Sequence, residues 1–230
     1  MDFHTIRLDI EEPVSRLALH RPDALNAMSI AMLDELTAAS ELLSSAREVR
    51  AVIITGEGRA FSAGADRKDP VIVAAFAGDE DATRRAAAAG AAAMKSIEEL
   101  RPATVAALHG PVIGGAIVLA ACCDLRVCHP GTRFRIPEVS LGIPLIWGGL
   151  PRLVRHLGPG RAKELVMLCR EFSATEATAW GFVNESPTDY MSRAAELAAA
   201  LAAMPAVPLG ITKRHVADIL AAVDAADPVS

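Results

Sequence analysis

The sequence predicts an α/β protein, because short apolar runs rich in β-branched residues alternate with helical segments along its 230 residues. The runs Val49–Thr55, Thr104–Leu108 and Leu125–Cys128 are almost wholly apolar, as strands buried on both faces of a sheet are. Glycine-containing loops follow the first two of these strands, at 56–66 and 110–114. Ligands of such sheets bind at loops that follow strands, so these two loops form the candidate site.

The N-terminal elements follow from local signals. Ile6–Ile10 and Val14–His20 are expected to form a strand pair, because an acidic turn with a proline separates them. Ser29 is placed to cap a helix that extends through Ser45, with apolar residues spaced for one face. An alanine-rich helix is expected over Asp81–Leu100, since a proline follows it closely.

The C-terminal elements are mostly helical. Gly115–Cys122 is expected to be a buried helix between two of the strands. From Trp147 onward, helical patterns dominate the sequence. Ser173 and Glu176 have the spacing of a capping box, and Gly181 stands where a C-terminal cap is expected.

Composition excludes several classes of protein. With 52% hydrophobic and 22% charged residues, the chain can build a large core, so disorder is excluded. The net charge is −5 and no segment concentrates Lys and Arg, which argues against nucleic acid and anionic membranes as partners. Aromatic residues make up only 4%, too few for the stacking platforms of single-strand binders.

The four cysteines indicate a reducing compartment, because three of them fall within one short segment that could not staple a secreted domain. The acidic N-terminus does not resemble a signal peptide, and the apolar segment 105–123 carries glycines and a proline typical of a strand, a loop and a helix. We therefore expect a soluble cytoplasmic protein. Cys123, Cys128 and His129 lack a fourth ligand at usable spacing, so no metal site is predicted.

Two nucleotide-binding motifs fail on single residues. A GxGxxG pattern begins at Gly56 but has Phe61 at its third glycine position. Gly110 and Gly115 have the spacing of a P-loop, but Ala116 occupies the position of the required lysine. Neither dinucleotide nor nucleoside triphosphate binding is expected.

The remaining feature is a pair of small-residue segments, Ala63–Ala65 and Gly114–Ala116, whose backbone amides no large side chain shields. If the two loops converge, one amide from each could point at the same oxygen, and the helix that starts at Gly115 would add its positive end. Such an oxyanion hole suits a thioester carbonyl that becomes an enolate. The alternative, which spacing alone favours, is that these glycines only permit tight packing.

Several motifs in a fixed order resemble the enoyl-CoA hydratase/isomerase (crotonase) superfamily over nearly the whole chain. They are Ala24–Ala27, Phe61–Asp66, Gly110–Asp124, Pro137–Val139 with Leu141–Gly142, and Glu176–Ala177 with Gly181–Asn184. The resemblance implies a spiral of repeated ββα units, expected at 1–185, and a C-terminal helical region at 186–230 that is shorter than usual for the family. It also implies a homotrimer or a dimer of trimers.

The resemblance assigns roles to particular residues. Ala65 and Gly115 would supply the amides of the oxyanion hole. Coenzyme A would be part of an acyl-CoA thioester substrate, and backbone groups near Ala24, Ala63, Ala65 and Asp66 would hold it. No prosthetic group is implied. Lys213 would approach its phosphates, or would lie on a solvated helix face.

The departures from the family pattern point to one reaction. Hydratases of the family carry two glutamates, and here Val118 occupies the position of the first while Glu138 retains the second. A single glutamate beside an oxyanion hole can still move a double bond, if a dry pocket raises its pKa. The resemblance therefore implies a Δ3-Δ2-enoyl-CoA isomerase, with an enoyl-CoA hydratase or a non-catalytic acyl-CoA binder as alternatives.

The segment Leu141–Trp147 has bulky apolar residues in place of the glycine-rich stretch of hydratases. Val118, Ile146 and Trp147 are expected to dry and narrow the acyl pocket. Ordinary core packing is the alternative for Trp147.

Overall fold

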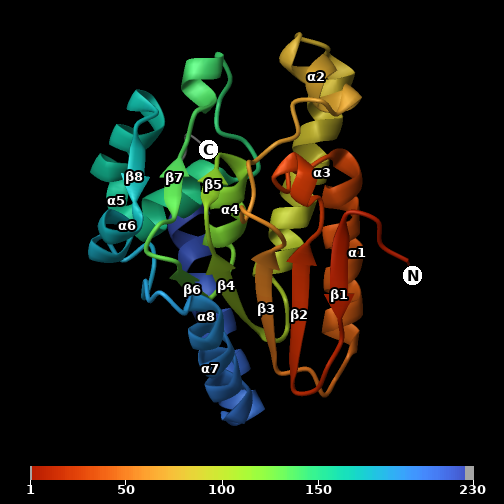
Figure 1. The fold of residues 1–230 in the computed structure, drawn as a ribbon, viewed down its shortest axis with the longest axis vertical. Coiled ribbons are helices and arrows are strands. Elements are labelled where there is room, and N and C mark those ends of the chain that lie inside the picture. Colours follow the sequence, from red (N-terminus) through yellow and green to blue (C-terminus); the bar gives the residue numbers. More distant parts are fainter. Residues whose placement is uncertain (1, 226–230) are drawn as a thin grey trace.

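The computed structural model describes residues 2–225 and contains two β-sheets with helices packed around them (Figure 1). The larger sheet has the strand order β1-β2-β3-β4-β6, in which β1 and β2 are antiparallel and all other neighbours are parallel. Its strands are β1 (Ile6–Asp9), β2 (Val14–Leu19), β3 (Ala51–Gly56), β4 (Ala103–Leu108) and β6 (Leu125–Cys128). The predicted α/β class and strand pair are confirmed.

The central strands are buried on both faces, as their apolar composition predicts. In β3, Val52 and Ile54 join the large core with α1 (Ile30–Ser45) and α3 (Glu80–Glu98), whereas Ala51 and Ile53 face the other side. Side chains alternate across a strand, so a strand between two helical layers must be apolar at every position. The helix α7 (Tyr190–Ala203) covers that second face.

The helix α1 begins where the sequence predicts. The Ser29 hydroxyl oxygen accepts a hydrogen bond from the Met32 amide at 3.2 Å, and the helix extends to Ser45. The predicted apolar positions Ile30 and Leu33 are buried. The capping box is also confirmed, since Ser173 and its N3 glutamate exchange hydrogen bonds at the start of α6 (Ala174–Ala179).

A second sheet contradicts the prediction that 110–114 is only a loop. Its three strands are β5 (Pro111–Ile113), β7 (Arg133–Arg135) and β8 (Glu171–Ser173). Each has three residues, too few for any periodicity in sequence, so only the long-range pairing makes them strands. The helix α2 (Pro70–Phe76) was also not predicted, although Asp69 caps it and Pro70 occupies its first position.

The short helix α4 (Gly115–Ala121) is wholly buried and is held at its C-terminal end by Arg126. The Arg126 guanidinium donates to the Cys123 carbonyl at 2.6 Å and to the Ala120 carbonyl at 3.4 Å. A cation beside the last carbonyls of a helix satisfies them and complements the negative end of its dipole. Arg126 therefore fixes the end of α4 that lies away from the glycine pair.

The C-terminal part is helical, as predicted. It contains α5 (Gly149–Leu168), which bends at Gly158, then α6, α7 and α8 (Ala206–Ala225). Most of the described part of α8 is exposed. In the described part of the chain, no one helix has the length and apolar character to cross a membrane; α7 and α8 satisfy that test only jointly, with a 110° bend between them.

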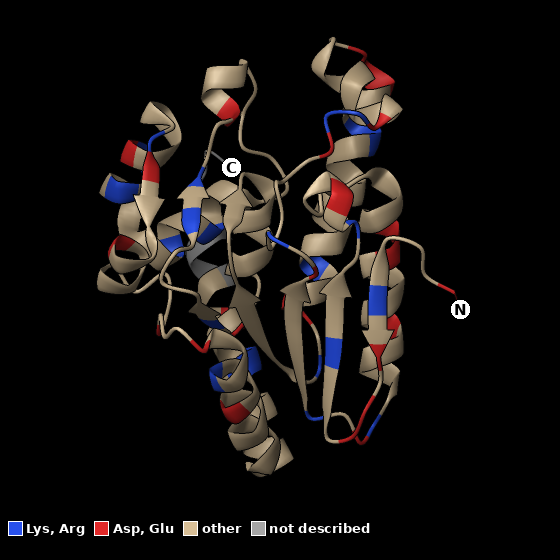
Figure 2. Ribbon diagram, viewed as in Figure 1, with Lys and Arg blue, Asp and Glu red and all other residues tan. Residues whose placement is uncertain are grey.

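Charged residues of both signs are interspersed over the outer helices and loops, and the central strands β3 and β4 carry none (Figure 2). This distribution matches the absence of clustered Lys and Arg in the sequence. Three cysteines have a raised thiol pKa because burial disfavours their thiolates: Cys122 and Cys123 in the buried α4 region, and Cys128 in β6.

Candidate active site

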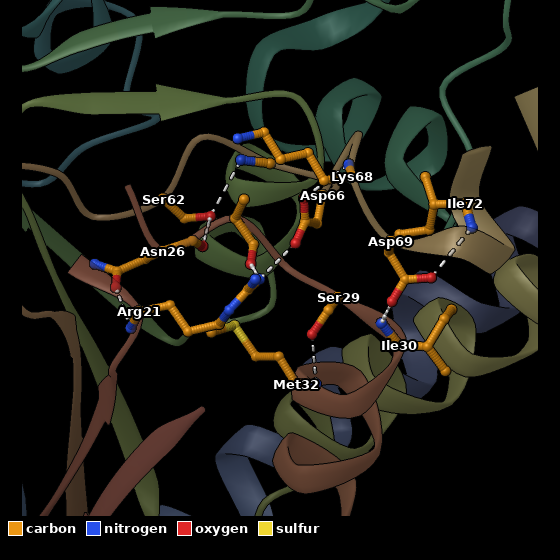
Figure 3. A network of polar contacts seen from close by, with 12 residues as sticks. Arg21, Asn26, Ser29, Ile30, Met32, Ser62, Asp66, Lys68, Asp69 and Ile72 are labelled. Atoms are coloured by element: carbon orange, nitrogen blue, oxygen red, sulfur yellow. Dashed lines mark hydrogen bonds and ion pairs between the residues drawn. The ribbon is translucent and has the colours of Figure 1, made fainter. Parts of the chain in front are cut away.

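The first loop of the candidate site is held by the buried side chain of Asn26 (Figure 3). Its amide nitrogen donates to the carbonyls of Glu57 and Ala60, both at 2.8 Å, and its amide oxygen accepts from the Arg21 amide at 2.8 Å. The Ser62 hydroxyl donates to the Asn26 carbonyl at 2.8 Å. The segment after β2 is thereby tied to the loop after β3.

The Asp66 side chain holds the loop together and is not exposed to a ligand. Its carboxylate is buried and pairs with the Arg21 guanidinium at 2.7 Å, and it also accepts from the Lys68 amide at 2.9 Å (Figure 3). The Asp66 side chain does not line the cavity described below. The Asp66 side chain is thus occupied in holding the loop, and contact of the backbone at Asp66 with coenzyme A stays a prediction.

The loops after β3 and β4 converge, which the sequence left open. Ser62 and Val112 form a parallel bridge, and the Ile113 amide donates to the Ser62 carbonyl at 3.1 Å. A Cβ built on Gly64 would lie 2.4 Å from the Ile113 carbonyl oxygen, so the two backbones touch where a side chain would not fit. Gly64 also has a φ of +83°, which glycine adopts at no steric cost.

This contact brings Ala65 and Gly115 to one cavity of about 170 Å³. Among the residues that the structure describes, neither of their amides donates a hydrogen bond to a backbone oxygen. Backbone donors left open at a cavity can bind an oxygen of a ligand. The wall of the cavity is otherwise largely apolar: Ala65, Ile72, Ala75, Phe76, Thr83, Ala86, Gly115, Glu138, Ile143, Pro144, Leu145, Ile146 and Trp147 line it.

Among the described residues that line the cavity, Glu138 is the one with a titratable side chain. The pairing of β5 with β7 places it there, because the Gly114 amide donates to the Arg135 carbonyl at 2.8 Å. A Cβ built on Gly114 would lie 2.3 Å from Glu138 Oε1, so the carboxyl group lies directly against the start of α4. Glu138 Oε2 is buried and accepts no hydrogen bond from any described residue.

Burial raises the pKa of Glu138 to about 7, and a hydrogen bond from its own backbone amide opposes that shift only partly. Desolvation disfavours the charged form of a carboxyl group, and no cation compensates for it here in the described residues. A carboxyl group with a pKa near 7 can both accept and donate a proton at neutral pH.

The raised pKa makes the stability of the protein depend on pH. Because the folded pKa of Glu138 lies above the unfolded one, the folded state binds more protons between them. The contribution of Glu138 to stability is therefore fully present below pH 4.5 and is lost as pH rises through about 7. At pH 8 the free energy of unfolding of Glu138→Gln is expected to exceed that of the wild type by up to ~3 kcal/mol, so the variant should unfold at a higher temperature. At pH 4.5 this difference should be absent.

Thermal unfolding of both proteins at several pH values measures this difference. An equal difference at every pH would contradict a raised pKa at this position.

The predicted pocket residues divide into two groups. Ile146 and Trp147 line the cavity, with Ile146 37% exposed and Trp147 almost fully buried. Val118 does not line it: the residue is buried, and Leu145 and Val118 Cγ2 pack together over Gly149. The prediction that Val118 forms part of the pocket wall is wrong: Gly115 of α4 lines the cavity, and Val118, farther along the same buried helix, does not.

The predicted coenzyme A residues also differ in their placement. Ala24 ends a 3-10 turn, η1 (Pro22–Ala24), and Ala63 donates its amide to the Leu25 carbonyl at 2.9 Å, so both belong to the tied loops. Lys213 lies elsewhere: its Nζ is 2.7 Å from Asp124 Oδ2 and 3.1 Å from the Pro102 carbonyl. Pro102 precedes β4, and a loop of the site follows the opposite end of that strand, so within one chain Lys213 lies at the end of β4 away from the cavity.

The α2 and α3 side of the cavity was not assigned residue by residue from the sequence, although pocket depth was expected to depend on the segment Val71–Thr83. Ile72, Ala75 and Phe76 of α2 and Ala86 of α3 line it. An aspartate followed by a proline before an apolar run is a helix-start signal and could have indicated α2. In the described residues, no three His, Cys, Asp or Glu side chains are grouped to hold a metal ion.

Comparisons with known proteins agree on one family. The family model for enoyl-CoA hydratase/isomerase matches residues 9–224. The short-chain-enoyl-CoA hydratase of Clostridium acetobutylicum is 32% identical over 219 residues, which cover 94% of this chain and 82% of that protein. The crotonyl-CoA hydratase of Syntrophomonas wolfei is 36% identical over 186 residues, or 80% of this chain and 70% of that protein. A crystal structure of an enoyl-CoA hydratase subunit from Geobacillus kaustophilus has a TM-score of 0.86 and 34% identity, covering 96% of this chain and 84% of that one.

Proposed function

This chain belongs to the enoyl-CoA hydratase/isomerase family and has its crotonase fold, and from that premise we propose that it isomerises 3-enoyl-CoA thioesters to 2-enoyl-CoA thioesters. The observation that carries the proposal is Glu138, whose buried Oε2 has no partner among the described residues and whose pKa is raised to about 7. No other described residue that lines the cavity can accept a proton at neutral pH.

The reaction needs an oxyanion hole and one base. The thioester carbonyl oxygen accepts hydrogen bonds from the Ala65 and Gly115 amides, which stabilises the negative charge that forms on it. The Glu138 carboxylate removes a proton from C2, the electron pair of that C–H bond moves into the enolate, and the C3–C4 double bond shifts to C2–C3 as the same proton is delivered to C4. The substrate gains and loses nothing, so one carboxyl group completes the cycle.

Hydration is the second candidate, because the relatives from Clostridium and Syntrophomonas are named as hydratases. Adding water to the 2,3 double bond requires a group that takes a proton from water and one that gives a proton to carbon. Glu138 can supply one of these roles. Val118 occupies the position of the first glutamate of hydratases, and it is buried and does not line the cavity, so no described side chain on the wall supplies the other role.

Two assays on one purified sample separate the candidates. We expect conversion of 3-enoyl-CoA to 2-enoyl-CoA at an ordinary enzymatic rate, and hydration of 2-enoyl-CoA slower by ~10²–10⁴-fold, the contribution of one missing general acid or base. Comparable rates in the two assays would favour the hydratase. Tight binding of both thioesters with no turnover would indicate a non-catalytic acyl-CoA binder.

The remaining parts of the proposal concern binding and assembly. Coenzyme A enters only as part of the substrate, held by the backbone of the tied loops near Ala24, Ala63, Ala65 and Asp66, and no prosthetic group takes part. A trimer or a dimer of trimers is supported by the exposed apolar residues of α8, which include Val207, Val216 and Ile219. Contact of Lys213 with coenzyme A phosphates, and a cytoplasmic location, stay predictions.

A further inference from the structure

Trp147 occupies an unusual position at the wall of the cavity. Its backbone φ is +62°, in the left-handed region that large side chains rarely adopt. Its indole is almost fully buried, and the Nε1–H donates to the Ala86 carbonyl of α3 at 3.0 Å. The hydrogen bond and the burial together hold the ring in one orientation.

Two glycines make the slot that the indole fills. A Cβ built on Gly90 of α3 would lie 2.0 Å from Trp147 Nε1, and a Cβ built on Gly115 of α4 would lie 2.3 Å from Trp147 Cζ3. Real Cβ atoms do not approach other atoms so closely. Neither glycine has a positive φ, so close packing against the ring, and not backbone conformation, is what requires glycine here.

The indole therefore lies beside the atoms that would react. Gly115 presents its amide to the thioester carbonyl in the proposed function, and the ring edge of Trp147 is in contact with the same residue. The Glu138 carboxyl group lies against Gly114, the residue before Gly115. An acyl group bound through its carbonyl oxygen is confined between the carboxyl group and the ring at its first carbons.

We propose that Trp147 is a specificity-determining residue that selects acyl groups without branches next to the thioester carbonyl. The inference rests on the proposed function for the orientation of the acyl group. A methyl branch at C2 would require space that the indole fills, since Gly90 and Ala86 hold the ring in place from α3. A straight chain avoids the ring and continues along the apolar side of Phe76 and Ile146.

Binding of two isomeric thioesters tests the proposal without catalysis. Butanoyl-CoA and 2-methylpropanoyl-CoA have the same number of carbons and no double bond to move, so they differ only in whether the last methyl group is attached at C3 or at C2. Titration calorimetry measures the dissociation constant of each thioester. The wild type is expected to bind butanoyl-CoA at least about tenfold more tightly than its isomer, because a methyl group that does not fit an apolar pocket weakens binding by about that factor. Trp147→Ala should reduce this preference to about threefold or less, because the slot is then empty.

Two further variants keep the test decisive if Trp147→Ala folds poorly. Trp147→Phe keeps an aromatic ring of smaller size and should give an intermediate preference. Trp180→Phe is the matched control, since Trp180 packs against Arg161 and Arg170 and does not line the cavity. The chain has two tryptophans, so the control also leaves Trp147 as the only tryptophan, and butanoyl-CoA should change the tryptophan fluorescence.

A double-mutant cycle tests the slot itself. Gly90→Ala should push the indole toward the cavity and weaken binding of both thioesters about tenfold. In the Trp147→Ala background the same glycine change should have no effect on binding, because there is no ring to displace. An equal effect in both backgrounds, or an unchanged preference in Trp147→Ala, would overturn the proposal.

The outcomes for the two proposals are distinguishable. If the protein proves to be a hydratase or a binder, the preference between the two saturated thioesters still tests Trp147. If the preference does not depend on Trp147 while 3-enoyl-CoA is isomerised, the function stands and the selectivity of the pocket arises elsewhere.

Discussion

Glu138→Gln is expected to lower kcat for 3-enoyl-CoA isomerisation by about 10⁴-fold, near the upper end of what a general acid–base group contributes. The effect should be large because the same carboxyl group both removes the proton from C2 and returns it at C4. Affinity for butanoyl-CoA should change little, since glutamine has nearly the same shape and the carboxyl group is about half neutral at pH 7. Steady-state kinetics and calorimetry on the same samples measure both quantities.

The pH profile gives the same residue a second signature. The wild-type kcat/KM should rise with pH and level off above the pKa of about 7, because the free enzyme must hold Glu138 ionised. Glu48→Gln is the matched control: Glu48 is exposed and lies before β3, so its loss should alter neither rate nor profile. A Glu138→Gln variant that retains a tenth of the activity would remove Glu138 as the base.

Gly64→Ala is expected to lower the isomerisation rate by at least ~10²–10³-fold, the effect of losing one oxyanion-hole donor. The added Cβ would lie 2.4 Å from the Ile113 carbonyl oxygen, which belongs to backbone and cannot rotate away. The two loops must then separate, and the Ala65 amide moves away from the Gly115 amide. Because backbone atoms move, kcat should fall even where substrate concentration is saturating.

Gly181→Ala separates this steric effect from backbone strain. Gly181 has a φ of +78°, close to the +83° of Gly64, but a Cβ built on it meets no atom within 4 Å. Both variants should lose about 1 kcal/mol of stability from the left-handed conformation, and thermal unfolding measures it. Only Gly64→Ala should also lose activity. Equal kinetics in the two variants would mean that the loop contact does not set the oxyanion hole.

The apolar cavity wall around Glu138 affects both the rate and the substrate preference. Its pKa is raised because apolar residues such as Leu145 and Trp147 line the same cavity and no described cation compensates the charge. A change that admits water, such as Trp147→Ala, should therefore also lower the pH at which kcat/KM levels off. The selectivity and the basicity of the site depend on the same packing.

Much of the fold could be predicted from local signals. Ser29 and Ser173 mark helix starts through side-chain hydrogen bonds to amides three residues away, and the apolar runs of β3 and β4 mark strands covered on both faces. The strands β5, β7 and β8 could not be predicted in this way. Each contains three residues and owes its conformation to partners distant in sequence.

The sequence by itself determined the family, the strands of the large sheet and the candidate groups, because caps, strand periodicity and motif residues act over a few positions. Only the tertiary structure decided that the loops of Gly64 and Gly115 meet, that Glu138 lies buried beside them, and that Val118 and Lys213 do not line the cavity. A pKa and a cavity wall depend on which atoms approach from other elements. The packing of β5 against β7, and of Trp147 between two helices, supplies those atoms here.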